Sequence, residues 1–138
     1  MQPSFELFDH TADLGVRAQA PTLAELVTHA IAGLYATIGE LAGGDVVATR
    51  TLTVRGDDQA VMLRDLLAEL LYVFESEGLI ACDPIVESFT GGELRVQAGL
   101  APLADGSTCD REVKAVTYHE LSLLSIPGGY EAVYIVDI

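Results

Sequence analysis

The sequence has no long hydrophobic run and few cysteines. No stretch approaches the roughly 18–20 continuous apolar residues of a membrane span, and the N-terminal MQPSFELFDH lacks the basic and apolar segments of a secretory signal. The two cysteines, Cys82 and Cys109, occur in neither a CxxC nor a CxxH pattern. We therefore expect a cytoplasmic protein with reduced thiols, no membrane segment and no thiolate zinc site.

Basic residues are equally scarce. Seven Lys and Arg stand against 21 Asp and Glu, which gives a net charge of −14, and Lys114 is the single lysine. Binding to phosphates requires clustered Lys and Arg that release counterions, so we expect little direct contact with nucleic acid. The acidity suits divalent cations or a basic protein partner. Solubility is an alternative reason for it.

Motifs for covalent catalysis are also missing. The sequence contains no GxSxG, no Walker loop, no GxGxxG and no cysteine–histidine pair at a zinc spacing. A stand-alone metal-dependent hydrolase would need a second acidic cluster for a two-metal site, and none is evident. We expect no catalytic residue and no enzymatic activity of the chain itself.

What remains is typical of one globular domain over residues 1–138, with half of its residues hydrophobic. Apolar residues recur at helical spacing over 22–38, where Thr22 and Glu25 form a capping box. A second helix over about 58–77 carries a leucine stripe, with Asp57 or Asp58 as its N-cap and Gly78 as its stop.

The other segments are typical of β-strands. They cover residues 4–8, 14–20, 46–55, 85–89, 93–100, 112–124 and 130–137. This order predicts an α+β fold, a two-layer sandwich in which two amphipathic helices pack on one face of a mixed, largely antiparallel sheet.

The segment DHTADLG, residues 9–15, concentrates polar side chains between two strands. In an extended chain Asp9, Thr11 and Asp13 would point to one side and His10 to the other. Oxygen ligands at this spacing can hold a hard cation such as Mg²⁺ or Ca²⁺. The same residue types also stabilise turns, so both interpretations stay open.

The C-terminal segment YEAVYIV, residues 130–136, is almost entirely apolar and is followed by Asp137 and Ile138. The Asp137 carboxylate and the chain terminus repel each other unless a cation or hydrogen-bond donors compensate. A frayed, exposed terminus is the alternative.

The segment KAVTYHEL, residues 114–121, offers further polar groups. As a strand it would place His119 on one face, and Lys114 and Glu120 on the other. His119 could be a ligand, a proton carrier or a structural residue, and Lys114 could offset carboxylates or contact a phosphate. Glu69 lies roughly 130° from the leucine stripe of its helix, which favours exposure to solvent.

Taken together, these segments resemble the archease family. The resemblance rests on DHTADLG, LLAELLY at 66–72, KAVTYHEL and the terminal VYIVDI, and it covers almost the whole chain. Two departures occur: Leu67 and Ala68 replace an aromatic residue and an asparagine of the family's helix motif, and Tyr130 replaces a tryptophan.

The resemblance implies an accessory protein of an RtcB-type RNA-splicing ligase, the enzyme that joins tRNA exon halves with GTP and Mn²⁺. The accessory protein would promote guanylylation of the ligase and its multiple turnover. A second activity implied by the resemblance is that of a chaperone for a tRNA cytosine-5 methyltransferase, improving its solubility and specificity.

The resemblance also implies a divalent metal ion (Ca²⁺, Mg²⁺ or Mn²⁺) as cofactor. Its implied ligands are Asp13, Asp137 with the adjoining Ile138, and Glu69 of the second helix. The expected neighbours of this site are Asp9, His10, Thr11, Lys114 and His119.

Overall fold

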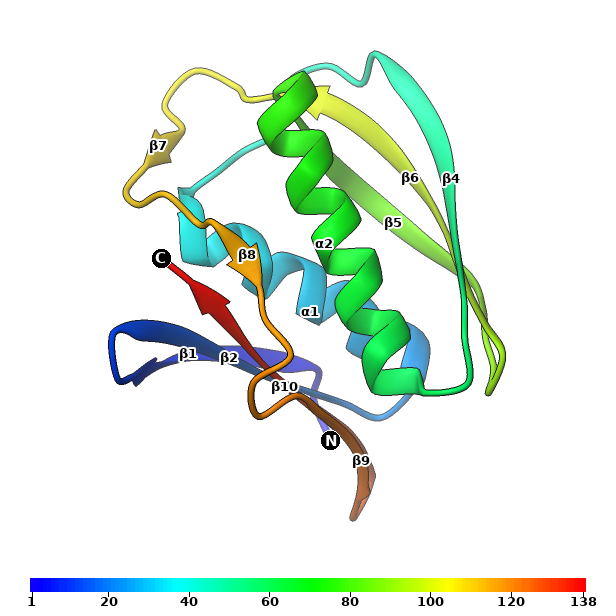
Figure 1. The fold of residues 1–138 in the computed structure, drawn as a ribbon. Coiled ribbons are helices and arrows are strands. Elements are labelled where there is room, and N and C mark those ends of the chain that lie inside the picture. Colours follow the sequence, from blue (N-terminus) through cyan, green and yellow to red (C-terminus); the bar gives the residue numbers. More distant parts are fainter.

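The computed structural model describes residues 1–138, which form two helices and ten strands (Figure 1). The helices are α1 (Leu23–Ile38) and α2 (Gln59–Glu77). The strands are β1 (Ser4–His10), β2 (Asp13–Ala20), β3 (Gly39–Glu40), β4 (Ala48–Arg55), β5 (Leu79–Phe89), β6 (Glu93–Pro102), β7 (Thr108–Cys109), β8 (Ala115–Val116), β9 (Ser122–Ile126) and β10 (Gly129–Asp137). Neither helix has the length and apolarity needed to span a membrane.

The strands are divided between two main antiparallel sheets. The first has the order β1-β2-β10-β8, with β9 also paired to β10, and the second has the order β4-β6-β5. Both helices pack against these sheets, so the predicted α+β class is confirmed (Figure 1). The division into two sheets was not predicted, and α1 contacts strands of both.

The helix boundaries agree with the predicted caps. The Thr22 hydroxyl accepts a hydrogen bond from the backbone N–H of Glu25, and the Asp58 carboxylate accepts one from that of Val61. Gly78 ends α2 in the left-handed conformation, with φ of 69°, which glycine adopts without a steric cost. Local side-chain chemistry therefore determines where both helices begin and where α2 ends.

Buried hydroxyl groups connect α1 to both sheets. Tyr134 of β10 donates to the carbonyl of Ala30, at 2.7 Å. The Tyr35 hydroxyl accepts from the backbone N–H of Ala81 in β5, at 2.9 Å, and burial raises the pKa of Tyr35 to about 12. These two tyrosines place the first sheet, α1 and the second sheet in fixed positions relative to one another.

The predicted strand over residues 112–124 is wrong. Only Ala115–Val116 and Ser122–Ile126 are strands, and irregular chain separates them. The Thr117 hydroxyl explains the interruption, because it donates to the Ile135 carbonyl and accepts from the backbone N–H of His119. The backbone then turns at Glu120, whose φ is 52°.

Strand β5 begins six residues before its predicted start, and its early part contains Pro84. Proline is tolerated at a sheet edge or a bulge. Both conditions hold here, because β5 is an edge strand and its register shifts between Cys82 and Ile85.

Candidate functional site

The segment around Asp9–Asp13 forms a tight hairpin between β1 and β2. His10 pairs with Asp13, which leaves Thr11 and Ala12 as the turn, and Ala12 has a φ of 63°. Directly opposed residues of antiparallel strands share a face. His10 and Asp13 therefore lie on one face and Asp9 on the other, so the predicted alignment of Asp9 with Asp13 is wrong: the chain reverses within the segment.

Asp137 lies directly opposite Asp13 on the neighbouring strand β10. Side chains at such positions have Cβ atoms about 4.5–5.5 Å apart and share a face. This face points away from α1, because the next residue, Leu14, is buried in the core. His10, Asp13 and Asp137 thus form a row across three adjacent strands.

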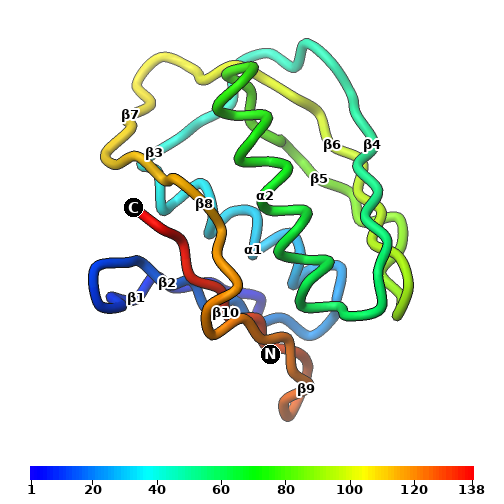
Figure 2. The backbone as a smooth tube through the Cα atoms, viewed as in Figure 1, coloured from blue at the N-terminus to red at the C-terminus, as the bar shows by residue number.

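No Lys or Arg side chain pairs with either aspartate of this row. Asp13 has one ion-pair partner, His10, whose Nδ1 lies 3.8 Å from Asp13 Oδ2, and Asp137 has none. Ile138, the residue after Asp137, is exposed. We call Asp13 and Asp137, with the adjoining Ile138, the acidic edge. Figure 2 shows the C-terminus between the β1–β2 hairpin and β8.

Lys114 adjoins the acidic edge through its backbone. Its N–H donates to the Asp137 carbonyl at 2.7 Å. Ala115 is the residue opposite Asp137, so strand alternation places the Lys114 side chain on the other face, toward α2. The lysine expected near the site is therefore close in the backbone but is not an ion-pair partner of Asp137.

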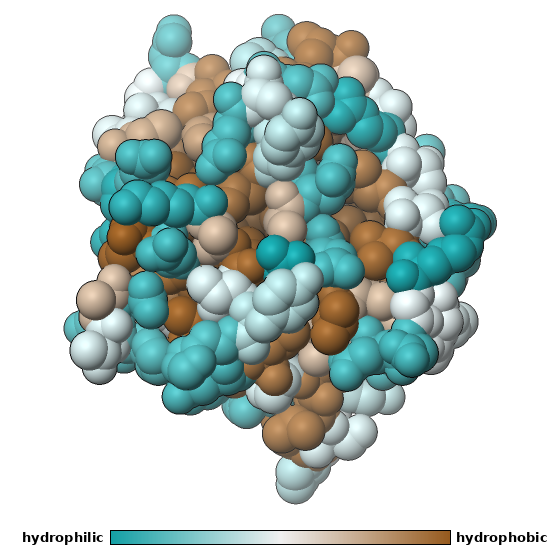
Figure 3. All heavy atoms as spheres, viewed as in Figure 1, coloured by the Kyte–Doolittle hydropathy of each residue, from teal (hydrophilic) through white to brown (hydrophobic).

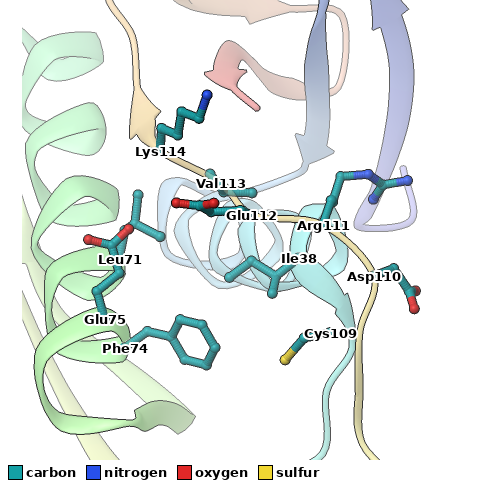
Figure 4. Close-up of a pocket in the computed structure, with 10 residues that line it drawn as sticks. All are labelled: Ile38, Leu71, Phe74, Glu75, Cys109, Asp110, Arg111, Glu112, Val113 and Lys114. Atoms are coloured by element: carbon teal, nitrogen blue, oxygen red, sulfur yellow. The ribbon is translucent and has the colours of Figure 1, made fainter.

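A cavity of about 690 Å³ opens on that side, between the ends of both helices and the segment before β8. Figure 4 shows Lys114 at its rim and the Glu112 side chain pointing toward α2, which carries Glu75. Sequence reasoning missed this cavity because three separate segments supply its lining: Ile38, Leu71, Phe74, Glu75, Cys109, Asp110, Arg111, Glu112, Val113 and Lys114.

Glu69 is not brought to the acidic edge. It is exposed on α2, and its charge acts on Arg50 of β4. Hydrogen bonds from Arg50 to Glu77 are the main cause of the raised pKa of Arg50, and Glu69 adds a smaller contribution. The α2 carboxylate on the side of Lys114 is that of Glu75.

His119 and Glu120 both approach His10. Glu120 Oε2 lies 3.3 Å from His10 Nε2, and the two imidazole rings meet edge to face with their centres 5.2 Å apart. The regular strand expected from the sequence would have placed His119 and Glu120 on opposite faces. The turn after Thr117 brings them to the same side, which no sequence pattern indicated.

Comparison with known proteins identifies the family. The model of the Archease protein family matches residues 5–138. The chain belongs to the archease family. The resemblance noted in the sequence is thereby confirmed.

Relatives within the archease family match over nearly their whole length. Protein archease of Thermococcus kodakarensis is 30% identical over 129 residues, which cover 91% of each chain. Protein archease of Methanosarcina mazei is 30% identical over 139 residues, covering 97% of this chain and 95% of the relative.

Solved structures agree with the archease fold. The solution structure of Methanobacterium thermoautotrophicum protein 1598 matches with a TM-score of 0.79 and 27% identity, over 98% of this chain and 99% of the other. The crystal structure of a Thermotoga maritima archease, described as a possible chaperone, has a TM-score of 0.67 at 17% identity, over 96% of each chain. The second likeness concerns the fold alone.

Proposed function

We propose that this archease-family chain is an accessory protein of an RtcB-type RNA-splicing ligase, promoting its guanylylation and multiple turnover through a divalent cation at the acidic edge. The observation that carries the proposal is the pairing of Asp13 with Asp137 on adjacent strands, with no Lys or Arg partner for either. Like charges directly opposite each other destabilise a sheet. A bound cation would remove that cost.

The donors available suit a hard cation. The side-chain carboxylates of Asp13 and Asp137 are oxygen ligands of the kind that Ca²⁺, Mg²⁺ and Mn²⁺ accept. The proposed ligands are Asp13, Asp137 and Ile138. Glu69 is left out of this set, because its carboxylate lies near Arg50 instead.

The role proposed for the chain is electrostatic and positional. A divalent ion held near the ligase's nucleotide pocket would offset phosphate charge while the ligase histidine attacks GTP. Asp13 and Asp137 would hold the ion on a rigid sheet, since backbone hydrogen bonds fix their strands along their whole length. The net charge of −14 disfavours RNA as the docking partner and favours a protein.

The test is a ligation time course with an RtcB-type ligase from the same organism, GTP and Mn²⁺, with the ligase limiting. Wild type should convert a single turnover into many, and Asp137→Asn should not. Glu69→Gln is the matched control, because it neutralises an exposed carboxylate outside the acidic edge, and it should stimulate like wild type. Full stimulation by both Asp13→Asn and Asp137→Asn would overturn the proposal.

A second candidate is a chaperone for a tRNA cytosine-5 methyltransferase. The Thermotoga maritima protein is described as a possible chaperone, and this chain exposes two adjacent apolar residues, Val46 and Val47, immediately before β4. Figure 3 shows brown atoms at the top of the molecule and at its lower end, and Figure 1 places β9 at the lower end. Leu124 of β9 is also exposed. Surface docking should survive Asp137→Asn, which separates this function from ligase activation.

A third and weaker candidate is a stand-alone metal-dependent hydrolase. It would require turnover by the isolated chain, which the ligase-free arm of the same time course measures.

A further inference from the structure

A second group of metal-ligating side chains lies beside the acidic edge. It consists of His10 at the end of β1, and His119 and Glu120 from the segment between β8 and β9. One ligand atom from each of the three residues lies within 4.8 Å of the others. We propose that His10, His119 and Glu120 form a separate site for a first-row transition-metal ion, for which Zn²⁺ is the probe.

The distances suit a small borderline ion. Ligand atoms bound to tetrahedral zinc at 2.0–2.1 Å are about 3.3 Å apart. His10 Nε2 and Glu120 Oε2 already have a separation of 3.3 Å, and His119 Nε2 lies 3.9 Å from Glu120 Oε1. The exposed His119 and Glu120 side chains need only small rotations to close on one ion.

The second nitrogen of His10 provides an independent observation. Its Nδ1 atom is buried and has no hydrogen-bond partner, and it is the only buried side-chain nitrogen or oxygen in that state. A metal on Nε2 would place the ring proton on Nδ1, 3.8 Å from the Asp13 carboxylate. Histidine ligands of metals commonly donate this proton to a carboxylate, which orients the ring and raises its basicity. Closing this contact would satisfy the buried nitrogen.

The segment that carries the other two ligands is already positioned. Thr117 bonds to the Ile135 carbonyl through both its hydroxyl and its backbone N–H. On the α2 side, Arg64 donates to the Val116 carbonyl and to the Tyr118 hydroxyl, and its guanidinium stacks 4.2 Å from the Tyr118 ring. Glu120 then holds a left-handed conformation, which non-glycine residues adopt mainly where surrounding structure imposes it.

The chemistry of this cluster separates it from the acidic edge. Imidazole nitrogens with one carboxylate suit zinc and related first-row ions, whereas Ca²⁺ and Mg²⁺ prefer oxygen ligands alone. With three protein ligands the ion would keep an open position. His119 and Glu120 are 63% and 55% exposed, so this position would face solvent and could accept a donor from a docked protein. The inference stands independently of ligase activation.

The test measures Zn²⁺ affinity of the full chain by competition with a chelating indicator, in excess Ca²⁺ to occupy oxygen-only sites. Wild type should bind one Zn²⁺. His119→Gln and Glu120→Gln should each weaken binding at least about tenfold, the lower bound known for disturbing even an outer-shell partner of a metal. His29→Gln is the control, because His29 lies on α1 against the Glu25 carbonyl, outside the cluster, and it should bind like wild type.

Imidazole ¹⁵N resonances give a readout that does not depend on the variants. Addition of Zn²⁺ should shift the signals of His10 and His119 and leave those of His29 in place. The proposal fails if wild type binds no Zn²⁺ in excess Ca²⁺, or if both cluster variants keep wild-type affinity. It also fails if the His10 and His119 signals do not move.

Discussion

Two charged regions of this molecule differ in whether their carboxylates have arginine partners. Where α2 meets β4, Arg50 donates to both oxygens of Glu77, at 2.8 and 2.9 Å, and these bonds lower the pKa of Glu77. At the other end of β4, Glu93 lies within ion-pair distance of Arg55 and Arg95. At the acidic edge, Asp13 and Asp137 face each other with no Arg or Lys partner.

The difference shows which carboxylates are available to a ligand. A carboxylate with a bidentate guanidinium has its lone pairs occupied and adds modestly to stability when exposed. Asp13 and Asp137 are held by strand pairing, which does not use their side chains, so their oxygens stay free. Backbone register places the two carboxylates, and the absence of a counter-charge is what would give the acidic edge its proposed affinity for a cation.

We expect the effect of changing a polar group to increase with the burial of that group. The largest effect is therefore expected for a group inside the core. Burial raises the pKa of Tyr35 to about 12, from 10.0. The stability that its neutral form contributes is fully present below pH 10 and is lost as the pH rises through 12. Two pKa units correspond to about 3 kcal/mol. In Tyr35→Phe, urea unfolding measured between pH 10 and 12 should show a loss of stability that is smaller by most of that amount.

The control for the tyrosine is Tyr72→Phe, since Tyr72 is 63% exposed. Its alkaline loss of stability should equal that of wild type. Tyr134 is completely buried and its pKa is also raised. Every variant that retains Tyr134 should therefore still lose some stability at alkaline pH. An identical pH slope for wild type and Tyr35→Phe would contradict the prediction.

The next effect concerns the partly buried acidic edge. Asp137→Asn removes one of two opposed carboxylates, so Ca²⁺ affinity measured by calorimetry should fall at least about tenfold. Glu77→Gln removes a carboxylate that Arg50 already occupies, and it should leave Ca²⁺ affinity unchanged. Equal losses in the two variants would mean that general surface acidity, rather than the acidic edge, binds the ion.

The parts of the fold that were predictable depend on local chemistry. Both helices agree with the predicted ranges to within a residue because their caps are side chains within a few positions, such as Thr22 with Glu25. The separation into two sheets was not predictable, because it depends on pairings between distant segments. Strand β10 pairs with β2 across more than a hundred residues, and no local pattern encodes that choice.

The candidate site was also predictable only in part. The closeness of Asp13 and Asp137 followed from the family resemblance, since their own sequence contexts left other interpretations open. For DHTADLG the sequence left a turn and an extended metal-binding segment as open alternatives, because Thr11–Ala12 lacks the Asn-Gly or Gly residues that mark most two-residue turns. Glu120 was missed because a strand was expected where Thr117 diverts the chain.

A smaller effect should appear in the unfolding of the metal-free protein. Opposed like charges on neighbouring strands cost up to about 1 kcal/mol. With a chelator present, Asp137→Asn should therefore raise the free energy of unfolding by about 0.2–1 kcal/mol over wild type. Added Ca²⁺ should reverse the order, because wild type alone gains the binding energy of the ion. A metal-free variant less stable than wild type would argue that Asp137 has an unrecognised partner.

The smallest effect is expected at the exposed pair, and it should have the opposite sign. The hydrogen bonds from Arg50 hold the pKa of Glu77 below its usual 4.5. A depressed pKa contributes stability above pH 4.5 that is lost as the pH falls through the folded-state value. Glu77→Gln should therefore be slightly less stable than wild type in urea at neutral pH, and the difference should shrink in acid and in 1 M salt. The prediction fails if Glu77→Gln is more stable than wild type, as Asp137→Asn is expected to be without metal. Paired and unpaired carboxylates would then behave alike.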